Sequence, residues 1–115
     1  MMIAVHQEID RFCDHLWLAD GLAQSTLASY RQDMVRFFNW CGACGLVAAT
    51  ASRGDVERYL AAQFSDKAKS SSVNRRLSTL KRFYRWRVES GAQAANPCEQ
   101  VDAARMTRYL PKNLS

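Results

Sequence analysis

The residues best suited to chemistry in this sequence are cations and hydroxyls, and they gather between Lys67 and Val88. This stretch holds eight of the chain's sixteen basic residues and no acidic residue, and a run of three serines lies near its start. Lysine, arginine and serine side chains are the usual partners of phosphate oxygens. The stretch therefore predicts a surface that binds a polyanion.

The apolar residues of this stretch predict an amphipathic helix that presents the cations. They recur at steps of three and four, namely Val73, Leu77, Leu80, Tyr84 and Val88. Successive ~100° steps place a polar set on the opposite side and two cations on the flanks. The polar set is Ser71, Arg75, Ser78, Thr79 and Arg82, and the flanking cations are Arg76 and Lys81. The last two turns are expected to be buried nearly all round.

The start of this helix is the part best suited to DNA. Backbone N–H groups and hydroxyls of residues 70–72 lie at the positive end of the helix dipole, where phosphate binds well. Asn74, Arg75 and Arg76 can reach base edges or phosphates. On periodicity alone, a solvated charged face explains these residues as well as DNA binding does.

Three other helices are expected to hold the basic helix in place. Apolar periodicity predicts the first at about residues 3–19 and the second from an N-cap at Gln24–Ser25 to about Ala43. Gly45 is typical of the position after a helix end. Ser52, with Asp55 three residues later, predicts the capped start of a third helix.

Asn96–Pro97 predicts a short fifth helical segment, since proline suits a first helical turn. From residue 103 the helical pattern dissolves, and no strand-like alternation is present. The predicted fold class is therefore all-α, a compact bundle of four helices plus a short fifth. The expected domain covers residues 1–102, and residues 103–115 are expected to be a linker.

The second helix offers a similar polar face. Its outward side carries Ser25, Ser29, Gln32 and Arg36, with Arg31 on the flank. Hydroxyls and an amide near a helix start suit contacts with a nucleic-acid backbone. Ordinary helix capping explains Ser25 equally well.

Charge is distributed unevenly along the chain. The formal net charge is +5, but residues 1–60 carry five basic and seven acidic side chains, and residues 61–115 carry eleven and four. This asymmetry favours contact with nucleic acid or an anionic membrane. No apolar run approaches the ~20 residues of a membrane span, and no signal-peptide pattern is present. A cytoplasmic protein with reduced cysteines is expected.

Redox and metal chemistry fit the sequence less well. The run from Trp40 to Cys44 is similar to the thioredoxin W-C-G-P-C motif, but alanine replaces the proline and the pair closes a helix rather than opening one. The dipole would then raise the thiol pKa instead of lowering it. Cys41 is expected in the core. The remaining cysteines and the two histidines lack paired spacing, so no metal and no cofactor is predicted.

Two blocks resemble conserved signatures of tyrosine recombinases and phage integrases. The first resembles T-x-x-x-Y-x-x-D-L-x-x-F-x-x-W/Y, through Thr26, Tyr30, Asp33, Met34, Phe37 and Trp40, with Met for Leu as the departure. The second resembles S-x-x-R-x-L-S-x-L-R-x-F-Y-x-Y/W, through Ser72, Arg75, Leu77, Ser78, Leu80, Lys81, Phe83, Tyr84 and Trp86. The first residues are most similar to the Xer branch, the XerD type more than the XerC type.

The resemblance implies an N-terminal core-binding domain with a SAM-like helical fold. In the family, this domain grips a half-site of double-stranded DNA with its second and fourth helices toward the major groove. Neighbouring recombinase protomers assemble with it into a tetrameric synaptic complex. The family's catalytic arginines, lysine, histidines and tyrosine lie in a downstream domain, so this chain alone is expected to bind DNA and cut nothing.

Residue patterns and resemblance together predict a set of DNA-contacting residues. The set is Ser25, Thr26, Ser29, Gln32, Arg36, Lys67, Lys69, Ser71, Ser72, Asn74, Arg75, Arg76, Thr79 and Arg82. Two alternatives stay open. One is a stand-alone helical DNA-binding regulator, and the other is a protein-interaction module that docks an acidic partner on its basic face.

Overall fold

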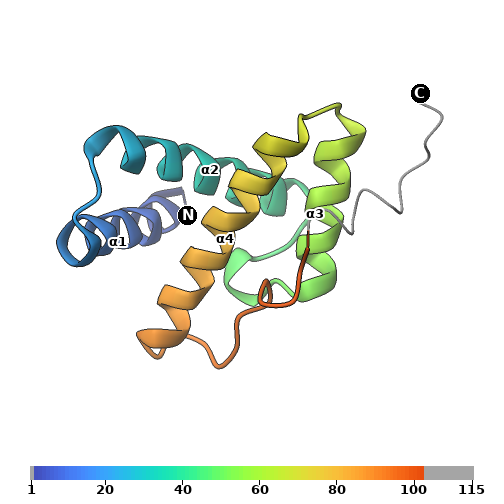
Figure 1. The fold of residues 1–115 in the computed structure, drawn as a ribbon. Helices are drawn as coiled ribbons and strands as arrows, with labels where there is room; N and C mark the ends of the chain where they lie inside the picture. The colour runs from blue at the N-terminus through green and yellow to red at the C-terminus, as the bar shows by residue number, and fades with distance from the viewer. Residues whose placement is uncertain (1, 103–115) are drawn as a thin grey trace. The chain divides into compact units, whose positions relative to one another are not determined.

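A computed structural model of the chain describes residues 2–102, with side chains described for residues 7–102. Its elements, in order, are α1 (Met2–Asp20), α2 (Gln24–Ala43), the short 3-10 helix η1 (Ala48–Thr50), α3 (Arg53–Ser65) and α4 (Ser70–Glu89) (Figure 1). Within the described range there is no strand. The all-α class is confirmed, and each of the four helices lies where apolar periodicity predicts it. The predicted linker, 103–115, lies outside the described residues.

The described part of the chain divides into two compact units, one that ends at Ala48 and one that begins at Ala49. In the first, α1 and α2 run side by side in opposite directions (Figure 1). The turn between them contains Gly21, whose φ of +64° suits a residue without a Cβ. The buried residues of the two helices, within the described range of side chains, are Ile9, Phe12, Cys13, Leu16, Asp33, Met34, Phe37 and Cys41.

The two ends of α2 are built differently. At its end, Gly45 has a φ of +72°, and the N–H of Leu46 donates to the carbonyl of Cys41 at 2.7 Å. This is the Schellman arrangement that Gly45 predicts. At its start, the N-cap is Ala23 with no side-chain cap, so the predicted cap at Gln24–Ser25 is wrong. The helix begins at Gln24, which places Ser25 inside its first turn.

The second unit begins with the predicted cap of α3. The Ser52 N–H donates to Asp55 Oδ2 at 2.9 Å, and the Asp55 N–H donates to Ser52 Oγ at 3.2 Å. This reciprocal pair is a capping box, which satisfies two otherwise unpaired amides. The backbone hydrogen bond from Ser52 is the main reason that the pKa of Asp55 lies below its ordinary value.

A tight turn joins α3 to α4. The Ala68 N–H donates to the Gln63 carbonyl at 3.0 Å, and Lys67 between the helices has a φ of +67°. Among the described non-glycine residues, it is the one with positive φ. The buried residues of this unit are Ala51, Val56, Tyr59, Leu60, Gln63, Val73, Leu77, Thr79, Leu80, Phe83, Tyr84, Arg87, Cys98 and Val101.

The segment after α4 folds back along that helix without forming the expected fifth helix. Pro97–Gln100 is a series of turns. Asn96 starts it, because its Oδ1 accepts from the Cys98 N–H at 2.8 Å and its Nδ2 donates to the Lys81 carbonyl at 3.2 Å. An asparagine side chain can support such a turn without a helix. Cys98 is buried here, and burial raises the pKa of its thiol to about 12.

None of the helices in the described part of the chain is both long and apolar enough to cross a membrane.

The capping box gives a test of the fold. Ser52→Ala removes the oxygen that accepts from the Asp55 N–H, so we expect the free energy of unfolding to fall by about 1 kcal/mol. Chemical denaturation measures this difference. Ser65→Ala, at the exposed end of the same helix, is the matched control and should change little. Equal stability of the two variants would contradict the role of the cap.

Candidate nucleic-acid interface

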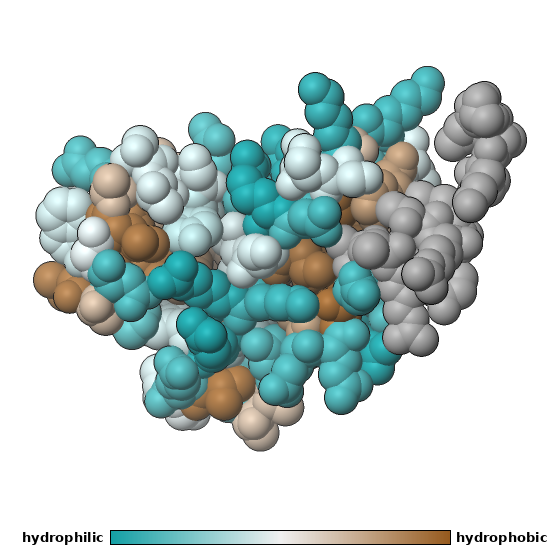
Figure 2. Space-filling model, in the orientation of Figure 1, coloured by the Kyte–Doolittle hydropathy of each residue, from teal (hydrophilic) through white to brown (hydrophobic). Residues whose placement is uncertain are grey.

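The first half of α4 exposes most of the predicted polar set. Ser71, Asn74 and Arg75 are exposed, while Ser72 and Arg76 are half-buried. Lys67 and Lys69 are exposed in the turn that precedes the helix. Seen from the side drawn in Figure 2, hydrophilic side chains follow much of the length of α4. These residues form the α4 polar face, and none of them is acidic.

The start of α4 leaves its backbone amides available. Its N-cap is Lys69, which provides no side-chain cap, and the first helical hydrogen bond runs from the Val73 N–H to the Lys69 carbonyl at 3.0 Å. The N–H groups of residues 70–72 therefore have no partner within the helix. Amides in this position, at the positive end of the helix dipole, attract phosphate oxygens.

The sequence-based prediction placed Thr79 on the exposed polar side of α4, and this is wrong. Its side chain is fully buried, and its Oγ1 donates to the Arg75 carbonyl at 3.2 Å. A threonine hydroxyl that bonds back along its own helix can be buried at low cost. Thr79, Phe83 and Arg87 form a second buried stripe at four-residue steps beside the predicted one. The sequence-based prediction assumed that α4 has one buried side, so it did not include this second stripe. Thr79 is therefore removed from the set of candidate DNA-contacting residues.

The expectation that the last two turns of α4 are buried nearly all round is wrong, because Phe83, Tyr84 and Arg87 are buried but Arg85 and Glu89 are exposed. Arg87 is 8% exposed, and its Nε donates to Gln93 Oε1. Its guanidinium carbon lies 6.0 Å from the centre of the Phe83 ring. Burial lowers the pKa of Arg87. This arginine therefore belongs to the interior, and it is not part of the α4 polar face.

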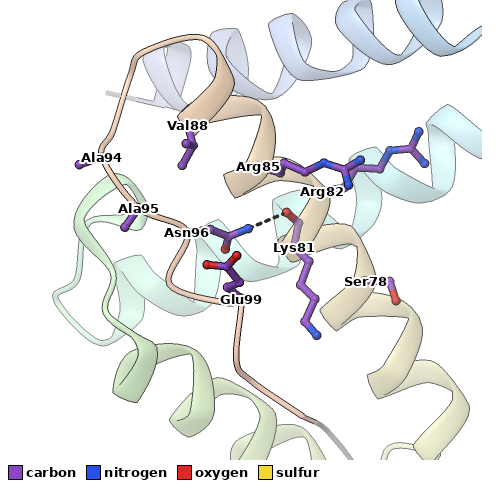
Figure 3. A pocket seen from close by; sticks show the side chains of 9 residues that line it. All are labelled: Ser78, Lys81, Arg82, Arg85, Val88, Ala94, Ala95, Asn96 and Glu99. Atoms are coloured by element: carbon purple, nitrogen blue, oxygen red, sulfur yellow. Dashed lines mark hydrogen bonds between the residues drawn. The ribbon is translucent and has the colours of Figure 1, made fainter.

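A basic recess of about 610 Å³ lies between α4 and the segment that folds back along it (Figure 3). Lys81, Arg82 and Arg85 contribute three cations to its lining, and Glu99 contributes a carboxylate. The hydrogen bond from Asn96 to the Lys81 carbonyl holds the opposite wall (Figure 3). A smaller recess of about 380 Å³ extends along the helix toward its start, with Asn74 in its lining.

Three polar residues on the α4 side of these recesses are absent from the predicted DNA-contacting set. They are Ser78, Lys81 and Arg85. Together with Asn74 they follow one line on α4, at steps of four, three and four residues. A predicted polar face centred on Asn74, in place of one centred on Arg75, would have included these three residues.

The polar face of α2 is exposed as predicted. Ser25, Thr26, Ser29, Gln32 and Arg36 are all exposed. Because Ser25 lies inside the first turn and caps nothing, capping no longer explains it. Its carbonyl accepts from Ser29 Oγ at 3.3 Å.

The α2 face also includes residues that the sequence did not single out. A shallow recess of about 690 Å³ is lined by Arg31, Gln32, Val35, Arg36 and Asn39. Arg31 is held by an ion pair with Asp10 of α1, and this hydrogen bond raises the pKa of Arg31. Asn39 continues the line of Gln32 and Arg36 and carries an amide that could contact a base edge.

The prediction that Cys41 lies in the core is confirmed. Cys41 is buried, and Cys44 is exposed at the C-terminal end of α2, where the helix dipole is negative. Across the described residues, no group of three or more His, Cys, Asp or Glu side chains could hold a metal ion.

Comparison with known proteins places this arrangement in a family. Residues 9–91 match the phage integrase N-terminal SAM-like domain. The chain is 36% identical to the tyrosine recombinase XerD of Ralstonia nicotianae over 109 residues, 95% of this chain and 35% of that protein. It is 39% identical to the XerD of Pseudomonas aeruginosa over 110 residues, 96% and 37% of the two chains.

The XerD of Shewanella oneidensis is 34% identical over 107 residues, 93% of this chain and 36% of that one. The chain thus spans about a third of the length of these relatives. No solved structure matches it significantly. The sequence, fold and relatives agree, and the chain belongs to the phage integrase N-terminal SAM-like domain family.

Proposed function

We propose that this chain is the DNA-binding domain of a XerD-like tyrosine recombinase and holds one half-site of double-stranded DNA. The observation that carries the proposal is the α4 polar face, an acid-free set of cations at an uncapped helix start. Helix amides and cations together suit backbone phosphates, and Asn74 and Arg75 can reach base edges. The exposed polar face of α2 supplies a second set of contacts.

The proposal assigns positioning, and not strand cleavage, to this chain. Tyr59 and Tyr84 are buried, Tyr30 is half-buried, and Tyr109 lies outside the described residues. A nucleophile must be accessible to the scissile phosphate and close to an activating group. We therefore assign the chemistry to the part of such recombinases that this chain does not span. Partner protomers in a tetrameric synaptic complex belong to the same proposal, as does a cytoplasmic, nucleoid-associated location.

Removing two cations tests the proposed surface. We expect Arg75→Ala with Arg82→Ala to weaken binding of a mixed-sequence duplex, and the slope of log affinity against log salt to fall by about 2, since each phosphate contact contributes roughly 0.9. Titrations at several salt concentrations measure both quantities. The control pair, Arg11→Ala with Arg58→Ala, removes the same charge from exposed positions on α1 and α3.

An unchanged affinity and slope in the Arg75/Arg82 variant would show that the surface is misassigned. Absence of duplex binding by the wild-type chain at low salt would overturn the whole proposal. That second outcome would favour a module that docks an acidic protein.

Lys67 gives a test that separates function from stability. Its positive φ suits glycine, so Lys67→Gly is expected to leave the free energy of unfolding unchanged or raise it by up to about 1 kcal/mol. The same change removes a cation beside the start of α4 and should weaken duplex binding. Lys67→Ala should weaken binding equally without the gain in stability. Wild-type affinity in both variants would exclude Lys67 from the interface.

A further inference from the structure

A hydrogen bond between α3 and α4 holds one cation of the proposed interface. Arg76 Nη1 donates to Gln63 Oε1 at 2.6 Å. Gln63 is 7% exposed, in the last turn of α3, and Arg76 is half-buried on the flank of α4. A buried acceptor of this kind restricts the rotamers of the long arginine side chain, so the guanidinium is fixed before any ligand arrives.

The partner of Arg76 is a neutral amide, as is the partner of the interior Arg87, whereas other arginines pair with carboxylates. Arg31, Arg53 and Arg58 form ion pairs with carboxylates. A carboxylate cancels most of the positive charge of its partner, whereas an amide oxygen orients the guanidinium and leaves its charge in place. Arg76 therefore keeps its full attraction for an anion.

The Gln63–Arg76 pair is incompletely satisfied in the described structure. Gln63 Nε2 and Arg76 Nε are both buried without a hydrogen-bond partner. Buried polar groups without partners are uncommon and are expensive to maintain. Two apolar side chains would fill the same space without this cost, so packing alone does not account for the pair.

We propose that Gln63 is a positioning residue, which holds the Arg76 guanidinium ready for a backbone phosphate of the bound duplex. This inference rests on the proposed function. The site is suitable because Lys67 and Lys69 are exposed in the turn that joins the two helices, and the free amides of residues 70–72 follow. A guanidinium fixed by one N–H group still has other donors for phosphate oxygens.

The most direct test replaces the neutral partner with a charged one of the same shape. Gln63→Glu should weaken binding of a mixed-sequence duplex and lower the salt slope by about 1, as Arg76→Gln should, because one phosphate contact is lost in each. Thermal stability should not fall, since the new carboxylate pairs with Arg76. Gln7→Glu, at an exposed position of α1, adds the same charge elsewhere and serves as the control.

A second variant keeps the test valid if Gln63→Glu does not fold. Gln63→Met removes the acceptor and should weaken duplex binding about three- to tenfold when Arg76 is present. In the Arg76→Gln background the same change should have no effect, since there is no guanidinium to position.

The inference is overturned if Gln63→Met has the same effect in both backgrounds, or if Gln63→Glu lowers affinity but leaves the salt slope unchanged. Either result would assign the pair a structural role only. The proposed function would still stand after such a result, provided that the wild-type chain binds duplex DNA with a salt-dependent affinity.

Discussion

The rotation of α4 about its own axis is the constraint on which the candidate interface depends. Burial of Val73, Leu77, Leu80 and Tyr84 fixes that rotation, since each large apolar side chain contributes roughly 1.5–3 kcal/mol when it is removed from water. A rotation that exposed this stripe would also bury several cations. The same packing that stabilises the helix therefore determines which cations reach the solvent.

The pattern of burial on α4 changes along its length, because a second buried stripe begins at Thr79 beside the first one. In its first half, one buried side leaves room for hydroxyls, an amide and cations on the other. From Thr79 onward, a second buried side includes Phe83 and Arg87. The polar face is thus concentrated where the helix amides are free, at the end whose dipole favours anions. Charge, hydrogen-bond donors and exposure coincide there for this reason.

Much of the fold could be predicted from the sequence, because local signals agree with the tertiary structure. Apolar periodicity locates the four helices, Gly45 marks the end of α2, and Ser52 with Asp55 marks the start of α3. Local signals are less reliable where the same residue types suit two different local conformations. Asn96–Pro97 suits a helix start and a turn equally well, and the segment forms turns.

The candidate site could be predicted in outline but not in detail. The exposed residues of α2 and most of those of α4 were identified from helical spacing. The burial of Thr79 was missed, because a polar residue beside an apolar stripe looks exposed when only one core direction is considered. The bond between Gln63 and Arg76 joins two helices, and no spacing rule for a single helix reports it. Likewise, the positive φ of Lys67 could not be predicted, because a lysine at this position does not indicate a left-handed backbone conformation.

The exposed polar faces of α2 and α4 are proposed to contact duplex DNA. The most direct measurement is the change in backbone amide chemical shifts of the isotopically labelled chain as a mixed-sequence duplex is added at low salt. We expect the largest changes at residues 25–36 and 67–82. Changes confined to α1 and α3, or no changes at all, would contradict this proposal.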